Sequence, residues 1–518
     1  MLVGTIGSPR RAHLDGAGQV TIGRATPDEI TIGWLIGAED RWYVPDREVT
    51  VRQSLVQGSP VVMTSVRIPG GDANQTVFGA VQGQRELVVI DVANKGRAPI
   101  VWALTISGSG ARRVTVDGST LRVDGFALVT MPRPPMLVSS APTIDELVSV
   151  VISGGAHNDL AKLASNGEDG RAFAFLVPVS QSTSVRAAVL IGASSSVALG
   201  SPPVLSALPD VHTAASGWGV HLARGPQLTG VDRQLIANLQ SVIGGALLAS
   251  EPLIADSSTD VRTRAVSARA FDALGLRAES GALLENIDEF QRRGGLIDDG
   301  HFGRSTSEAM LTSALTIDAL CYHAWVTQDT VFAETLAPAV AGAAEALVKA
   351  ARKDPSLGPL LASLGLISAL FSVAGDVRAA QQAKALWERL GRVWPMPAAP
   401  LPALPASSSG ASFVPDQALR LAAFGRSAAG VVSAVGPDGV VDLFPGFEPG
   451  WRGTSFEARN VPVPGGQLSV AVRWHGERPA FLWEGTGSAG LALTCSSIDP
   501  SWSATGLSGE ALLAFGCS

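Results

Sequence analysis

Residues 1 to about 225 alternate between apolar and polar side chains with the two-residue period of β-strands. Val49 and Val51 belong to one alternating segment, and Asp-Gly pairs ending at Gly118 and Gly125 close two others, as hairpin turns do. Many short strands at this spacing are typical of a β-sandwich. The pattern therefore predicts an N-terminal β-sandwich over residues 1–225, with a short helix within the stretch 143–165.

The apolar period then changes to the three-to-four-residue spacing of amphipathic helices, as at Leu311 and Leu315. Ser305 and Glu308 carry the signature of a capping box at the start of one helix. We predict a helical-hairpin domain over residues 226–394. At typical helix lengths it holds about seven helices, and short loops between them imply antiparallel neighbours.

A linker rich in Pro, Ala and Ser follows at residues 395–411 and precedes a second β-region over residues 412–518. In that region Leu468, Val470 and Val472 alternate with polar or small neighbours. The predicted fold class is therefore multidomain α+β. It comprises an N-terminal β-sandwich, a central all-α helical-hairpin domain and a small C-terminal β-domain.

Composition narrows the class of protein. Hydrophobic residues make up 46% of the 518-residue chain and charged residues only 16%, which excludes intrinsic disorder. The formal net charge of −7 argues against nucleic acid and against an anionic membrane surface as partners. The start of the chain lacks the apolar run of a signal peptide, so we expect a cytoplasmic protein.

The three cysteines are too few for a disulfide framework. Cys495 and Cys517 could pair, but reduced thiols fit a cytosolic setting better. Cys321 lies in a helical pattern, where we expect a buried thiol.

One uncharged stretch, residues 355–375, is long enough to span a bilayer. A helix buried inside a large helical domain has the same composition. The charged helices on both sides, and the proline and glycines within the stretch, favour the buried helix over the membrane span.

Three parts of the sequence resemble the six-hairpin glycosidases. They are Val61–Val77 together with Leu87–Thr105, the Q…DG hairpin of Gln291–Asp329, and Leu443–Glu484. The resemblance implies a β-sandwich packed on a toroid of paired helices, a C-terminal β-domain over the far end, and carbohydrate as the partner. Six hairpins require twelve helices, so about seven leave the ring open unless a second copy of the chain, in a homo-oligomer, completes it.

Glycoside hydrolysis needs two carboxylates across the scissile bond, about 6.5–9.5 Å apart for inversion and about 5–5.5 Å apart for retention. Asp298, Asp299 and His301 lie in the loop Gly294–Gly303, the longest connection in the helical region. From there they could line the concave end of the hairpins. The alternative is that Asp299 and Gly300 form a turn, which Asp298 caps.

Glu308 and Asp318 are the other candidate catalytic carboxylates. Glu308 follows the loop and could point into the same cavity, but it also completes the capping box with Ser305. Asp318 lies in an apolar stretch of the next helix, near the face of Leu311 and Leu315. A carboxylate in such surroundings is either paired or functional.

Three aromatic residues and His301 are the candidates for substrate contact. Tyr322 and Trp325 share a helix face and could stack on a sugar, although large aromatics at this spacing more often form core. Trp42 lies in an aromatic cluster of the sandwich, and sandwich loops of the six-hairpin glycosidases often reach the active site.

The sequence contains no phosphate-binding P-loop, no zinc-binding helix motif, no nucleophile turn and no dinucleotide fingerprint. We therefore expect no cofactor and no metal. Two functions stay open: a carbohydrate-active protein such as an inverting hydrolase of an oligosaccharide, or a non-catalytic relative that serves as a sugar-binding or structural scaffold. The resemblance favours the first. The short helical region and the low aromatic content of 6% favour the second.

Overall fold

The computed structural model describes residues 1–23, 29–108, 113–159, 172–193, 200–301, 306–390, 429–436 and 439–514. The chain divides into two compact units, Met1–Val220 and His221–Ser518. The predicted linker at 395–411, Ser305 of the predicted capping box and Cys517 lie outside the described residues.

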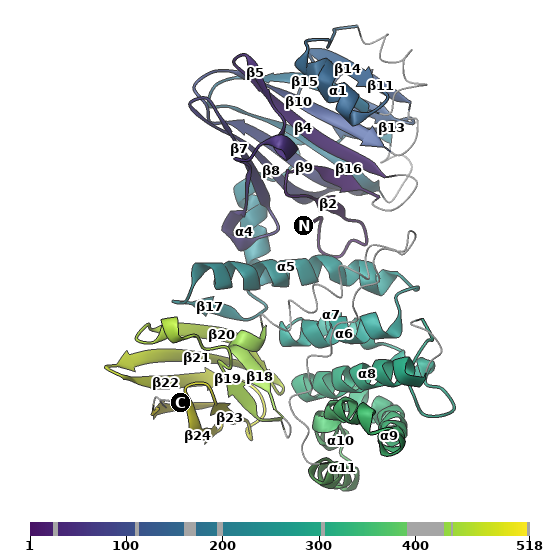
Figure 1. Ribbon diagram of the computed structural model, residues 1–518, viewed down its shortest axis with the longest axis vertical. Coiled ribbons are helices and arrows are strands. Elements are labelled where there is room, and N and C mark those ends of the chain that lie inside the picture. The colour runs from purple at the N-terminus through teal and green to yellow at the C-terminus, as the bar shows by residue number, and fades with distance from the viewer. Residues whose placement is uncertain are drawn as a thin grey trace. The chain divides into compact units, whose positions relative to one another are not determined.

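Within the described residues, the first unit holds two antiparallel sheets of eight strands each (Figure 1). One sheet has the order β1-β2-β3-β4-β10-β15-β14, with β5 paired to β4, and the other has the order β11-β12-β13-β16-β9-β8-β7-β6. The first sheet comprises β1 (Leu2–Val3), β2 (Ala12–Leu14), β3 (Val20–Ile22), β4 (Ile30–Ala38), β5 (Arg41–Tyr43), β10 (Ile100–Gly108), β14 (Leu137–Ala141) and β15 (Ala172–Val179). The second comprises β6 (Arg52–Leu55), β7 (Val62–Ile68), β8 (Gly71–Gln82), β9 (Arg85–Asn94), β11 (Val114–Asp117), β12 (Thr120–Val123), β13 (Phe126–Thr130) and β16 (Ser184–Ala193).

A single hydrophobic core joins the two sheets. Trp102 of β10 and Phe175 of β15, from the first sheet, belong to the same buried cluster as Val66 of β7 and Ile90 of β9, from the second. Alternating strand residues place one apolar face of each sheet against the other, which is how a sandwich buries its core. The predicted N-terminal β-sandwich is therefore confirmed.

A helix covers the outer face of the first sheet. α1 (Ile144–Ile152) buries Leu147 and Val151 in a second, smaller cluster with Leu35 and Ala174. The side chain of Thr143 accepts a hydrogen bond from the backbone N–H of Glu146 and so caps the helix start. The short helix predicted within 143–165 is present.

The chain is helical over α4 (Val211–Leu222), a stretch for which we expected strands. The carboxylate of Asp210 accepts a hydrogen bond from the N–H of Thr213 at 2.7 Å, and the carbonyl of Asp210 accepts one from the N–H of Ala214. An aspartate that can cap the first turn is a start signal for a helix. The expectation of continuous β-structure overlooked it.

Seven α-helices follow between Arg233 and Arg389, counted over the described residues, as the sequence predicted (Figure 1). They are α5 (Arg233–Ala255), α6 (Val261–Ala273), α7 (Arg277–Leu284), α8 (Thr306–Thr327), α9 (Thr330–Lys353), α10 (Ile367–Val373) and α11 (Val377–Arg389). Two 3-10 helices, η4 (Ile287–Phe290) and η5 (Pro355–Leu366), lie among them.

Aspartates begin four of these helices. The side chains of Asp232, Asp260, Asp329 and Asp376 each accept a hydrogen bond from a backbone N–H in the first turn of α5, α6, α9 and α11. Such a cap satisfies donors that the first turn leaves without an intrahelical partner. The starts of these four helices can thus be predicted from a few neighbouring residues in the sequence.

The uncharged stretch 355–375 forms η5 and α10. Within the described residues, Thr330–Lys353 and Pro355–Val373 are long and apolar enough to cross a membrane by length and composition alone. Half of the window in the second segment is buried inside the protein, and η5 packs against α8 and α9. Buried side chains such as Leu361 and Leu364 account for the apolar composition by packing within the helical region.

The second unit also holds two sheets, built from its C-terminal strands together with β17, which precedes the helices. The five-stranded sheet has the order β17-β20-β21-β22-β25, and the four-stranded sheet has the order β18-β19-β23-β24, counted over the described residues. Their strands are β17 (Gln227–Thr229), β18 (Ser433–Val435), β19 (Val441–Leu443), β20 (Phe456–Val463), β21 (Gly466–His475), β22 (Arg478–Gly485), β23 (Ala492–Cys495), β24 (Asp499–Thr505) and β25 (Ser508–Leu512). Phe444 packs edge-on against Phe456 and Phe481 in their shared core, with ring centroids 5.0 and 6.0 Å apart.

The C-terminal strands contact the helices directly. Arg277 of α7 donates hydrogen bonds to the carbonyls of Val463 and Gly466, and the N–H of Gly465 donates to the carbonyl of Val326 at 3.0 Å. Burial lowers the pKa of Arg277 below its ordinary value. The predicted multidomain α+β architecture is confirmed, with the helices and the C-terminal strands in one compact unit.

Two cysteines are free thiols buried in this unit, Cys321 on α8 and Cys495 on β23. Burial raises the pKa of Cys321 well above its ordinary value and raises the pKa of Cys495 to about 12. The thiolate is the species that reacts. We therefore expect neither thiol to react with a disulfide reagent near pH 8 in a folded C517S variant.

Thionitrobenzoate release from that variant would measure this. Release should stay near the blank until guanidinium unfolds the chain, and should then correspond to both remaining thiols. Fast release of one equivalent from the folded variant would contradict the burial of its source.

Candidate functional site

The loop that carries Asp298 and Asp299 is fixed to two helices. Gln291 and Ile297 pair as an isolated antiparallel bridge within the loop. The side-chain amide of Gln291 donates to the carbonyl of Ala339 on α9 at 2.8 Å. The hydroxyl of Ser313 on α8 accepts from the N–H of Ile297 at 2.9 Å. Gln291 and Ile297 are therefore bonded to each other, to α9 and to α8.

Asp298 is an internal ionic anchor of this loop. Its side chain is 1% exposed and forms an ion pair with the guanidinium of Arg292. The Nε–H of Arg292 also donates to the carbonyl of Asp298 at 3.1 Å, and the N–H of Asp298 donates to the carbonyl of Phe290. These contacts tie the two ends of the loop together.

Asp299 contacts the start of a helix. Its Oδ2 accepts a hydrogen bond from the N–H of Val261, the first residue of α6, at 2.8 Å. Its Oδ1 accepts from the N–H of His301 at 2.9 Å. Asp299 thus serves the N-terminus of α6, and a negative charge there interacts favourably with the helix dipole. Both Asp299 and His301 are exposed.

Glu308 and Arg262 join the starts of α8 and α6. An Nη of Arg262 donates to Oε2 of Glu308 at 2.7 Å, and the guanidinium also donates to the hydroxyl of Thr312 at 2.9 and 3.1 Å. Arg262 is almost fully buried, whereas the Glu308 side chain is 41% exposed. The carboxylate therefore compensates the charge of a buried arginine.

Asp318 meets a second arginine of α6. Its Oδ2 lies 3.3 Å from Nε of Arg269, and the Arg269 guanidinium lies over the ring of Tyr322, 3.4 Å from the ring centroid. Burial raises the pKa of Tyr322 above its ordinary value. The sequence allowed Asp318 to be either paired or functional, and the structure places it in an ion pair.

A third contact between the same helices is the most deeply buried. The ring Nδ1 of His323 lies 3.0 Å from each carboxylate oxygen of Asp272, and the hydroxyl of Ser280 donates to Oδ2 of Asp272 at 2.8 Å. The Asp272 side chain is 0% exposed and the His323 side chain 6%. An ionised carboxylate only accepts, so Nδ1 is the donor in this pair.

These three contacts form one row between α6 and α8, which lie side by side (Figure 1). We call the row the polar ladder; it consists of Arg262–Glu308, Arg269–Asp318 and Asp272–His323. The sequence analysis missed Arg262, Arg269, Asp272 and His323. A signal was available for α6, because its three members are seven and three residues apart and so share a helix face.

The structure separates the predicted carboxylates along the ladder. It brings Asp299 and Glu308 to the start of α6, through Val261 and Arg262. Asp318 is ten residues further along α8 than Glu308, and at 1.5 Å of rise per residue this is about 15 Å. That exceeds the separation of about 6.5–9.5 Å for an inverting pair.

The three aromatic residues predicted to contact substrate pack against other residues of the protein. Tyr322 and Trp325 are buried, with ring centroids 5.4 Å apart. Gly439, at φ +77°, lies so close to Trp325 that a Cβ there would come within 2.5 Å of Nε1. Trp42 belongs to β5 of the other unit, where its ring packs over Gly37.

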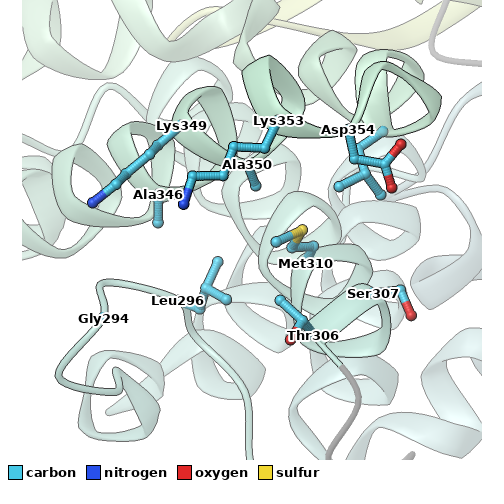
Figure 2. A pocket seen from close by; sticks show the side chains of 11 residues that line it. Gly294, Leu296, Thr306, Ser307, Met310, Ala346, Lys349, Ala350, Lys353 and Asp354 are labelled. Atoms are coloured by element: carbon cyan, nitrogen blue, oxygen red, sulfur yellow. The ribbon is translucent and has the colours of Figure 1, made fainter.

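A cavity of about 400 Å³ opens near the loop (Figure 2). Lys349 and Lys353, one turn apart on α9, extend over it toward the Gly294 segment, while the carboxylate of Asp354 lies toward the far end. Hydrogen bonds from Ser356 lower the pKa of Asp354. The cavity is lined by Gly294, Leu296, Thr306, Ser307, Met310, Ala346, Lys349, Ala350, Lys353, Asp354 and Leu357.

This lining differs from the predicted site. Among its described residues there is no aromatic side chain, and none of the eight predicted site residues. Two lysines against one aspartate give the cavity a positive balance. Within the described residues, no group of three or more His, Cys, Asp or Glu side chains is placed to hold a metal ion.

The sequence matches no protein-family model and no curated protein. Among solved structures, it is similar to a bacterial glucoamylase complexed with acarbose, with a TM-score of 0.43 and 10% sequence identity. The similarity covers 74% of this chain and 65% of the glucoamylase, so it spans less than two thirds of that protein. The class of this protein is accordingly given by its own architecture, a multidomain α+β chain with a sandwich, a helical-hairpin region and C-terminal sheets.

Proposed function

We propose that this chain is a non-catalytic scaffold that binds carbohydrate without hydrolysing it. The observation that carries the proposal is the engagement of the predicted carboxylates. Asp298, Glu308 and Asp318 each pair with an arginine, and Asp299 binds the N-terminus of α6.

Hydrolysis requires one carboxyl group that holds its proton near neutral pH, which needs an apolar or negatively charged setting. A neighbouring guanidinium or helix N-terminus instead favours the charged carboxylate. The separation of about 15 Å between Glu308 and Asp318 also argues against their acting as a pair. Structural roles account for all four side chains.

The ligand class in this proposal comes from the sequence resemblance of Val61–Thr105 and Leu443–Glu484 to the six-hairpin glycosidases. A net charge of −7 opposes nucleic acid as an alternative partner. The seven α-helices that the described residues form between Arg233 and Arg389 are fewer than the twelve of a complete six-hairpin toroid. This count further supports a binding role, because a closed toroid is what surrounds the substrate in the catalytic arrangement that the resemblance implies.

The test is a pair of measurements on the whole chain with a panel of neutral mono- and oligosaccharides, including acarbose. We expect reducing-sugar release at the level of the buffer blank. We expect at least one saccharide to raise the thermal midpoint, because a ligand at about 100 times its Kd adds about 2.7 kcal/mol of stability.

Two variants make the hydrolysis measurement decisive. Glu308→Gln is compared with Glu345→Gln, a matched change at an exposed carboxylate on α9. Sugar release by the wild type that disappears in E308Q and persists in E345Q would overturn the non-catalytic proposal. A thermal midpoint that no saccharide moves would overturn the carbohydrate part of it.

A further inference from the structure

A second cavity, of about 820 Å³, lies entirely within the N-terminal unit. It opens where the end of β13 and the turn after it meet the β15–β16 turn, the start of β16 and the segment around η3 (Leu205–Ala207). Small-molecule sites have volumes of about 300–1,000 Å³. The lining residues are Ser119, Thr130, Met131, Pro132, Arg133, Ser180, Thr183, Ser184, Val185, Arg186, Pro203, Leu205 and Ser206.

The lining has an unusual balance of polar groups. Six of its residues are serine or threonine, two are arginine, and none of the described lining residues is acidic. Hydroxyl groups both donate and accept hydrogen bonds, and arginine only donates. The cavity thus offers many hydrogen-bond partners and a positive charge to a ligand that brings acceptor oxygens.

The two arginines are placed differently. Arg186 is held by Asp91, with Nε and an Nη each 2.7 Å from a carboxylate oxygen, and its other Nη donates to the carbonyl of Leu208 at 3.3 Å. The hydrogen bonds to Asp91 raise the pKa of Arg186. It forms a fixed, neutralised wall of the cavity.

Arg133 carries the uncompensated charge. One of its Nη groups donates to the carbonyl of Pro178, and the described residues provide neither a carboxylate nor another acceptor for the rest of its guanidinium. It lies exposed in the turn after β13, at the rim of the cavity. A guanidinium with free donors binds planar carboxylate or phosphate oxygens in two-pronged fashion.

Thr130 provides an independent observation. It is 5% exposed and forms part of the lining, yet its hydroxyl has no hydrogen-bond partner among the described residues. A buried polar group without a partner is rare in native proteins and destabilises the fold. A ligand oxygen that reached this hydroxyl would remove that cost.

We infer that this cavity binds a small anionic ligand rich in hydroxyl groups, of the class of sugar acids and sugar phosphates. Arg133 binds the anionic group, and the serine and threonine hydroxyls bind the ligand hydroxyls. The inference concerns a different site from the helical region and does not depend on the proposed function.

The experiment measures binding to the full chain by calorimetry at low ionic strength. The probes are glucose 6-phosphate, glucuronate, inorganic phosphate and neutral glucose. We expect at least one of the two anionic sugars to bind at least ~10-fold more tightly than glucose and than phosphate alone, because both the anion and the hydroxyls contribute. The relative affinities of glucose 6-phosphate and glucuronate distinguish a phosphate site from a carboxylate site.

Two variants test the assignment of residues. Arg133→Gln should weaken binding of the anionic sugar at least ~10-fold, whereas Arg97→Gln, at an exposed arginine of the same unit that does not line the cavity, should leave it unchanged. Thr130→Val keeps the side-chain shape and removes the hydroxyl that lacks a partner. It should weaken binding ~3- to 10-fold without lowering the thermal midpoint of the free protein.

Equal binding of glucose and the anionic sugars, no binding of either anionic sugar, or unchanged affinity in R133Q would overturn the inference. Binding of neutral oligosaccharides that R133Q leaves intact would belong to the proposed function instead, so the two ideas fail separately.

Discussion

Asp272→Ala is expected to lower the free energy of unfolding of the second unit by about 1–3 kcal/mol, the usual cost of leaving a buried hydrogen-bond donor without its acceptor. Asp272 accepts from both His323 and Ser280, and all three side chains are buried. The hydroxyl of Ser280 keeps a second acceptor, the carbonyl of Ala268. Most of the lost stability would therefore come from His323, whose buried Nδ1 loses both of its contacts with the Asp272 carboxylate.

Guanidinium unfolding of the full chain would measure this effect, with hydrogen exchange of the α6 and α8 amides to localise it. Asp272→Asn keeps the shape and one acceptor oxygen, so it should cost less than the alanine variant. Glu345→Gln, exposed on α9, should change stability by less than about 0.5 kcal/mol. A loss below about 1 kcal/mol for D272A would show that the innermost contact of the polar ladder does not hold α6 to α8.

Trp102→Ala is expected to destabilise the N-terminal unit by about 3–5 kcal/mol. Trp102 is 0% exposed and packs in the core between the two sheets, in the same cluster as Trp34 and Phe175. Its truncation removes the transfer free energy of the indole and leaves a cavity that a sheet on each side cannot close.

Trp102→Phe, compared with Trp102→Ala, separates the effect of the indole N–H from that of the ring volume. The indole N–H of Trp102 has no hydrogen-bond partner among the described residues. Phenylalanine removes this donor while keeping an aromatic ring, so we expect a much smaller loss than for alanine. Thermal unfolding followed by circular dichroism would rank the two variants. If Trp102→Phe and Trp102→Ala lowered the stability equally, the volume of the aromatic ring would not be what stabilises this core.

The fold was predictable because its signals are local. Strands such as β7 and β21 follow from alternation of apolar side chains. Several helices begin where an aspartate such as Asp260 or Asp376 accepts hydrogen bonds from the first free N–H groups. The helix α4 was missed although Asp210 gave the same start signal, because β-like segments on its N-terminal side dominated the pattern.

The candidate site was predictable only in part. Sequence spacing placed Asp298, Asp299 and Glu308 around one loop, and Asp318 on an apolar helix. It could not show which arginine each carboxylate would meet. Arg262 lies 46 residues before Glu308 in the chain, and Asp272 lies 51 residues before His323. No local pattern encodes such pairings.

The order of the domains and the positions of most strands and helices follow from the amino-acid sequence, because hydrophobic periodicity, helix caps and turns depend on neighbours a few residues apart. The role of each charged side chain depends instead on groups that are distant in the sequence and close in the fold. A carboxylate acts as an acid, a cap or an ion-pair partner according to the groups that surround it. For Asp298, Asp299, Glu308 and Asp318 those groups are two arginines of α6, an arginine of the loop, and the N-terminus of α6.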